Sequence, residues 1–146
     1  MAVSREIVIE IAECLRRGIV LAQDNGDHPE SWVQRFPRNC CNNAANLLVV
    51  ALRGVGAKKI FREIGTVENG DRHVWVNVDG FRVDITADQF DGPTIVVAID
   101  SEWHAAITDA KPYSDLRDGL PDGLSSEEID RLTEIHEKTL KSLMAK

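Results

Sequence analysis

Cysteines, long apolar runs and basic clusters are all scarce in this chain of 146 residues, and each shortage excludes a class of protein. The three cysteines, two of which are the adjacent Cys40 and Cys41, fit no disulfide framework and favour a reducing compartment. No stretch approaches the roughly 20 apolar residues that a transmembrane helix needs. Arg5, Glu6 and Glu10 stand where a secretory signal would be apolar. We therefore expect a cytoplasmic protein with no membrane partner.

Basic side chains are outnumbered, with 17 Lys and Arg against 24 Asp and Glu and a net charge of −7. Because no basic cluster exceeds a pair, nucleic acid is not an expected partner. The segment Gly54-Val55-Gly56 lacks the further glycine and the helix of a phosphate-binding loop, so we expect no nucleotide cofactor. With 43% hydrophobic residues, the chain is expected to form a single domain over residues 1–146 around one core.

Hydrophobic periodicity predicts an α+β fold of helices and a small antiparallel sheet. Ser4 precedes an amphipathic helix, and we interpret Cys14 as a packing residue on its apolar stripe. The stripe consists of Ile7, Ile11, Cys14, Leu15 and Ile19. The remaining expected elements are strands within 59–67, 73–86 and 94–99, a surface loop at 108–123 and a final helix at 125–143.

The segment from His73 to Thr86 predicts a β-hairpin whose turn is Asp79-Gly80, because both central positions of such a turn need positive φ. Side chains alternate along each strand, so the valines form a face that seeks the core. His73 and Asp84 then become diagonal neighbours on the other face, where the carboxylate can accept a hydrogen bond from the imidazole. A polar face that only contacts solvent is the plainer interpretation.

Two adjacent cysteines, Cys40 and Cys41, open the second predicted helix, which stops near Gly54. A helix N-terminus offers N–H groups without partners and a partial positive charge, which favour a thiolate and can hold an oxyanion. With an imidazole alongside, such a cysteine becomes a candidate nucleophile. The structural alternative is that both cysteines are small buried residues.

Three segments resemble the transglutaminase-like and papain-like cysteine enzymes, which carry Cys, His and Asp in that order along the chain. They are Phe36-Pro37-Arg38-Asn39-Cys40-Cys41, His73-Val74-Trp75 and Asp84-Ile85-Thr86-Ala87-Asp88-Gln89-Phe90. The resemblance covers about residues 32–100, and the last segment is its most specific part. Small bacterial members carry glycine where this chain has Asn39, and alanine where it has Val74. The resemblance implies a papain-like or transglutaminase-like fold, with a nucleophile helix packed on a small antiparallel sheet.

The resemblance assigns the nucleophile to Cys41, the base to His73 and the orienting carboxylate to Asp84. Cys40 stays open as the alternative nucleophile, because a sequence places a helix boundary only to within a few residues. Asn at position 39 is the next most tolerant residue after glycine for positive φ, so the loop before the helix can keep its shape.

Four further residues are candidates for supporting roles. The side-chain amides of Gln34 and Gln89 are possible donors to an oxyanion. Trp75 either walls a substrate groove or covers the site. His104 follows the last predicted strand and is placed to approach the cleft.

These residues predict a cysteine-dependent enzyme that needs no cofactor and attacks an amide of a peptide or protein substrate. Hydrolysis through a thioester would make it a peptidase, an amidase or a glutamine deamidase, and an amine acceptor would make it a transglutaminase. A non-catalytic peptide-binding module on the same fold also stays open. A zinc site made from Cys40, Cys41, His73 and Asp84 is disfavoured, because adjacent cysteines rarely reach one ion together.

Overall fold

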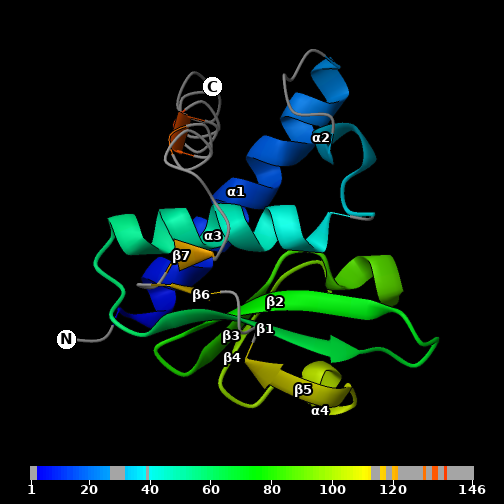
Figure 1. Cartoon of the computed structure of the whole chain (residues 1–146). Helices are drawn as coiled ribbons and strands as arrows, with labels where there is room; N and C mark the ends of the chain where they lie inside the picture. Colours follow the sequence, from blue (N-terminus) through cyan, green and yellow to red (C-terminus); the bar gives the residue numbers. More distant parts are fainter. Residues whose placement is uncertain are drawn as a thin grey trace.

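A five-stranded antiparallel sheet with two long helices on one face organises the part of the chain that the computed structural model describes (Figure 1). The described residues are 3–26, 32–38, 40–112, 116–117, 120–121, 130, 133–134 and 137. The helices are α1 (Arg5–Asn25), α2 (Trp32–Arg35), α3 (Cys41–Gly54), the 3-10 helix η1 (Ala87–Phe90) and α4 (Glu102–Ala105). The strands are β1 (Ile60–Thr66), β2 (Arg72–Val78), β3 (Phe81–Asp84), β4 (Val96–Ala98), β5 (Thr108–Pro112), β6 (Leu116–Arg117) and β7 (Leu120–Pro121). The order of the large sheet is β4-β3-β2-β1-β5, while β6 and β7 pair separately.

The predicted hairpin is confirmed by β2 and β3, with Asp79 at φ 47° and Gly80 at φ 93° in its turn. Val76 pairs with Val83 in the expected register. The Asp79 carboxylate also accepts hydrogen bonds from the backbone N–H groups of Val3 at 3.0 Å and of Lys59 at 2.8 Å. The turn is therefore tied both to the start of the chain and to the segment before β1.

An apolar core fills the space between α1, α3 and one face of the sheet. The sheet contributes the valines and the isoleucine that the hairpin pattern predicts, Val74, Val76, Val78, Val83 and Ile85. The helix α3 contributes Ala44, Leu47, Leu48, Ala51 and Leu52. Ser4 caps α1 as expected, but the buried stripe of that helix is Val8, Ala12, Leu15 and Ile19. Ile7, which the sequence pattern placed on the stripe, is 40% exposed, and Cys14 is only partly buried.

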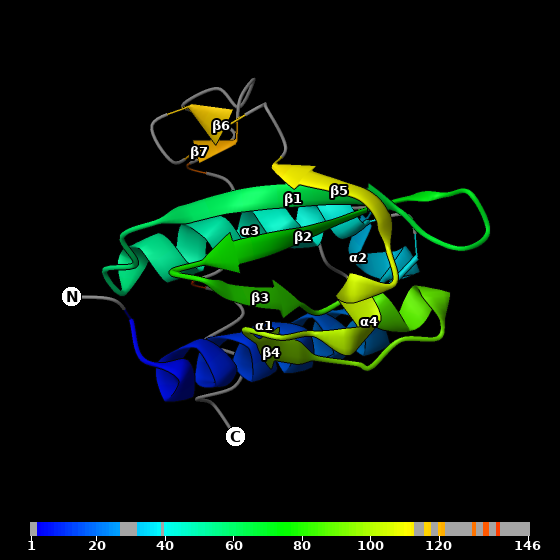
Figure 2. The same ribbon diagram turned by 90° about the horizontal axis from the view of Figure 1, so that it is seen from below.

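The opposite face of the sheet is also covered at one end. Trp75 packs there with Val67 and Ile107, and partly buried aromatic rings of Phe90 and Trp103 lie against them. The views in Figures 1 and 2 place η1 and α4 at the end of the sheet where α3 begins. The interpretation of this face as a surface in contact with solvent is therefore wrong.

Two glycines allow the covering segments to approach the sheet closely. A Cβ at Gly92 would lie 2.7 Å from the Trp103 ring, and a Cβ at Gly65 would collide with Ile107. A larger residue at Gly65 would push Ile107 away from the sheet, and one at Gly92 would push apart the covering segments that carry Ala87 and Trp103.

Two expectations from the sequence, the loop at 108–123 and the helix at 125–143, are not confirmed by the structure. The segment expected as a loop at 108–123 begins with β5, which pairs with β1 at the edge of the sheet. The predicted C-terminal helix at 125–143 lies almost wholly outside the described residues. In the described ranges, no helix combines the length and the apolar character that crossing a bilayer would require.

Candidate active site

His73 near the start of β2 and Asp84 at the end of β3 form a direct pair, as the hairpin register predicts. Nε2 of His73 lies 2.6 Å from Oδ2 of Asp84. The two residues are 0% and 1% exposed, so this charge-assisted contact is shielded from water. Because both residues are buried, Asp84 needs hydrogen-bond partners, since a buried carboxylate without them would lower the stability of the fold.

The Asp84 carboxylate has further partners that the sequence pattern did not assign. Nε2 of His104 lies 2.7 Å from the same Oδ2 atom that contacts His73. The other oxygen, Oδ1, accepts hydrogen bonds from the backbone N–H of Thr86 at 2.9 Å and from its hydroxyl at 3.3 Å. Both oxygens of this buried carboxylate are thus satisfied.

Ser101 completes the chain of contacts from the far side of His104. Its hydroxyl oxygen caps α4 by accepting from the backbone N–H of His104 at 3.2 Å and lies 2.6 Å from Nδ1 of the same residue. With its oxygen already accepting, the hydroxyl can donate its own proton to Nδ1, which leaves the proton of His104 on Nε2, facing Asp84. We call the four residues Ser101, His104, Asp84 and His73 the polar chain.

The electrostatics of the polar chain favour a carboxylate beside an imidazolium. Burial raises the pKa of Asp84, but hydrogen bonds from His104 and His73 outweigh it and hold this pKa well below its usual range. Burial lowers the pKa of His73, but its hydrogen bonds with Asp84 and Cys41 and the nearby negative charge raise it from 6.5 to about 9. At neutral pH the His73 ring is therefore protonated.

Cys41 is the first residue of α3 and is only partly buried. It is close enough to His73 to interact with the ring through its side chain. Since Nε2 of His73 faces Asp84, Nδ1 is the ring atom left for the thiol, and Nδ1 makes no hydrogen bond in the described part of the chain. Cys41 therefore counts as a neighbour of the His73–Asp84 pair through its effect on the pKa of His73.

Cys40 differs from its neighbour in both burial and electrostatics. It is 1% exposed and belongs to the apolar core between α1, α3 and the sheet. Burial raises the pKa of the Cys40 thiol to about 12. Because the thiolate is the reactive form of cysteine, Cys40 is a poor nucleophile at neutral pH.

Aromatic rings enclose His73 on several sides. The centroid of its ring lies 5.7 Å from that of Trp75, 5.2 Å from that of Phe90 and 5.6 Å from that of Trp103. Trp75 is 1% exposed and donates a hydrogen bond from Nε1 to Glu63 at 3.0 Å. So little of Trp75 reaches the surface that it covers the polar chain and does not wall a groove.

The candidate amide donors have different surroundings. Gln34 is exposed on α2, and its backbone carbonyl accepts from the side chain of Gln23 at 3.0 Å. Gln89 is partly buried on η1, where it lines a cavity together with Phe90, the ring that contacts His73. Of the two, Gln89 is the one that the fold brings near the polar chain. Asn39 lies outside the described residues.

The side chains of His73, Asp84 and His104 also form a group with the composition of a metal site, with one ligand atom from each within 4.8 Å of the others. In this structure both Nε2 atoms are at hydrogen-bond distance from the carboxylate. A bound ion would need both nitrogens to lose their protons and both hydrogen bonds to break. We therefore interpret His73, Asp84 and His104 as joined by hydrogen bonds and not by a metal ion. Of the zinc ligands considered from the sequence, Cys40 lies in the apolar core.

The sequence placed His104 near the cleft, but it predicted neither the contact of His104 with Asp84 nor the role of Ser101, although a signal was present. Ser101-Glu102 is a typical start of a helix, and it places a histidine three residues after the cap. Comparison with known protein families, with curated proteins and with solved structures gives no match to this chain. The argument about function therefore depends on the geometry of the site and on the resemblance of its sequence segments.

Proposed function

We propose that this chain is a cysteine-dependent acyl-transfer enzyme of the papain-like or transglutaminase-like type, with Cys41 as nucleophile, His73 as base and Asp84 as the orienting carboxylate. The observation that carries the proposal is the buried His73–Asp84 pair, whose imidazole also interacts with a thiol at a helix N-terminus. The order of these residues along the chain and the segments around them support the same conclusion.

In the proposed reaction, the proton of the Cys41 thiol already resides on Nδ1 of His73, which gives the protonated ring described above, and the thiolate attacks the carbonyl carbon of an amide. The first backbone N–H groups of α3 have no partner within the helix, since its first internal hydrogen bond runs from Ala44 N–H to Cys40 O at 2.9 Å. These N–H groups can stabilise the oxyanion that forms. Protonated His73 then releases the amine, and a thioester to Cys41 remains.

Water as the second reactant gives a peptidase, an amidase or a glutamine deamidase, and hydrolysis is the reaction that we propose. An amine as the second reactant gives transamidation. Intact-mass analysis after incubation with a glutamine-containing peptide, with and without a primary amine, distinguishes the two. A gain of the amine mass less the mass of the released ammonia indicates transamidation, and a gain of one mass unit at glutamine indicates deamidation.

The reactivity of Cys41 towards iodoacetamide tests the proposal directly. At neutral pH we expect Cys41 to be alkylated roughly 10- to 100-fold faster than Cys14, because an imidazolium favours the thiolate beside it. Cys14 is the internal reference, since both cysteines are partly buried. Peptide mapping by mass spectrometry measures each rate in the same sample.

His73→Ala is the matching variant, in which Cys41 should lose its excess reactivity while the rate at Cys14 stays the same. Equal and slow alkylation of all three cysteines in the unaltered protein would contradict an enzyme. That result would favour the non-catalytic peptide-binding module.

A further inference from the structure

A cavity of about 930 Å³ lies next to His73, and the reaction proposed above does not use it. The described residues around it come from the turn between β1 and β2, from the end of η1 and from α4 with the segment after it. Phe90 and Trp103 line the cavity and also contact the His73 ring. These two rings therefore border both the cavity and the base.

The cavity lies at the end of the molecule where α3 begins. Figures 1 and 2 both show η1 beside the N-terminal end of that helix, and η1 supplies Gln89 and Phe90 to the cavity. A peptide whose carbonyl is attacked by Cys41 would thus have a neighbouring side chain within reach of this space.

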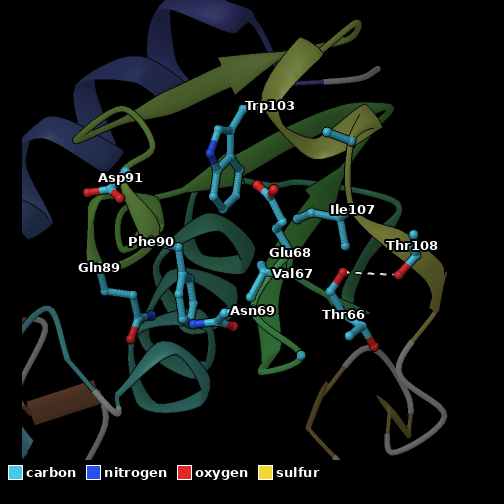
Figure 3. A pocket seen from close by; sticks show the side chains of 12 residues that line it. Thr66, Val67, Glu68, Asn69, Gln89, Phe90, Asp91, Trp103, Ile107 and Thr108 are labelled. Carbon is cyan, nitrogen blue, oxygen red and sulfur yellow. Dashed lines mark hydrogen bonds between the residues drawn. The ribbon is translucent and has the colours of Figure 1, made fainter.

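Apolar and aromatic surfaces form much of the cavity wall. Val67 and Ile107 are buried there, and the rings of Phe90 and Trp103 are partly exposed. Figure 3 shows the two rings near the side chains of Val67 and Ile107, and the four residues pack in one apolar cluster. Such walls suit a long aliphatic stem.

The charge of the cavity is negative. Glu68 and Asp91 line it, and no Lys, Arg or His occurs among its 12 lining residues. Figure 3 shows the Glu68 carboxylate extending from the turn toward Trp103. Glu68 has no ion-pair partner among the described residues. A carboxylate beside aromatic faces attracts a cation, through its charge and through the negative face of the rings.

We propose that this cavity binds a lysine or arginine side chain of the substrate, with its stem against Phe90 and Trp103 and its charged end near Glu68. The proposal deepens the proposed function, because it names the substrate class of the same site. Binding itself can be measured without any reaction, so the two proposals can fail separately.

The test uses two acetylated tripeptide amides that differ only in the central side chain, lysine or norleucine. Isothermal titration calorimetry with the full chain carrying Cys41→Ser measures both dissociation constants without chemistry. We expect the lysine peptide to bind about tenfold more tightly, as an ion pair and a cation–π contact each contribute a factor of a few. Glu68→Gln in the same background should reduce this preference to about twofold or less.

Glu10→Gln, an exposed change on α1 far along the chain from the cavity, is the matched control and should keep the full preference. Equal dissociation constants for the two peptides, or no binding of either one, would overturn the inference. So would a lysine preference that survives Glu68→Gln unchanged.

If the preference depends on Glu68 but Cys41 is no more reactive than Cys14, the cavity assignment stands and the proposed function fails. If Cys41 is alkylated fast but the lysine peptide is not preferred, the proposed function stands and the cavity assignment fails.

Discussion

The two faces of the sheet are both buried near the site, but by different kinds of contact. Val74, Val76 and Val83 meet the aliphatic side chains of α1 and α3 on one face. On the other face His73 and Asp84 belong to the polar chain, which Trp75 covers. Apolar contacts need only the right volume, whereas each donor and acceptor in the polar chain needs a specific partner.

This difference separates stability from chemistry in the molecule. A loss of volume on the apolar face removes packing energy and leaves the protonation of His73 unchanged. A change in the polar chain alters which groups carry charge, because hydrogen bonds there set the pKa values of Asp84 and His73. Variants on the two faces should therefore have different signatures.

Asp84→Asn is the change with the largest expected effect on reactivity. The amide cannot supply the negative charge that raises the pKa of His73, so the imidazolium beside Cys41 is lost near neutral pH. We expect the alkylation rate of Cys41 at pH 6.5 to fall roughly 10- to 100-fold relative to Cys14, because each unit by which the pKa of His73 falls shifts the equilibrium from the thiolate–imidazolium pair to the neutral pair by a factor of ten. Peptide mapping after timed iodoacetamide exposure gives this ratio.

Val76→Ala is the matched change on the apolar face, where the residue is fully buried. It should lower the free energy of unfolding by about 1 to 3 kcal/mol through the cavity that it creates. The ratio of Cys41 to Cys14 alkylation should not change. A Cys41 rate that falls equally in both variants would show that packing, not charge, controls the thiol.

The pH dependence of stability sharpens the same comparison. The pKa of His73 is raised from 6.5 in the unfolded chain to about 9 when folded, so its stabilisation is complete below about pH 6.5. It is lost as the pH rises through 9. Asp84 acts in the opposite direction, because its lowered pKa gives stability that is present above about pH 4 and disappears in more acidic solution.

We therefore expect urea denaturation to show a free energy of unfolding on the order of 2 kcal/mol lower at pH 9.5 than at pH 6.5. An NMR titration of the His73 ring should have its midpoint near 9. The midpoint should fall below 7 in Asp84→Asn and stay near 9 in Val76→Ala. A midpoint near 6.5 in the unaltered protein would contradict the pairing with Asp84.

The apolar face is the part of the fold that the sequence predicts well, and the reason is periodicity. Alternating valines and the Asp79-Gly80 turn fix the hairpin register, and this register makes His73 and Asp84 neighbours. The spacing of apolar residues after Cys41 likewise predicts α3. In α1 the same reasoning places Leu15 and Ile19 correctly on the buried stripe, but it starts the stripe at Ile7 when Val8 is the buried residue, because both are aliphatic.

The polar face is less predictable because short segments cover it. The helix α4 has four residues, which is too few to show a helical period, and β5 carries charged residues and a proline that are typical of a loop. The burial of His73 and the contact of His104 with Asp84 depend on these segments. Pairing between distant parts of a chain leaves no local pattern.

Ser101→Ala has the smallest expected effect and tests the far end of the polar chain. The change removes the side-chain cap of α4 and the hydroxyl next to Nδ1 of His104. We expect the free energy of unfolding to fall by about 1 kcal/mol, as for other lost caps. Since Ser101 acts on His73 only through His104 and Asp84, Cys41 alkylation should slow by only about two- to threefold.

Ser4→Ala is the control for this variant, because Ser4 caps α1 in the same way, by accepting from Ile7 N–H at 3.3 Å. It should cost a similar free energy of unfolding and leave Cys41 alkylation unchanged. Ser101→Thr keeps the hydroxyl and should restore both stability and reactivity. If Ser101→Ala and Ser4→Ala affect Cys41 equally, the hydroxyl of Ser101 serves only as a helix cap. A larger effect from Ser101→Ala means that the polar chain transmits changes over its whole length to the thiol.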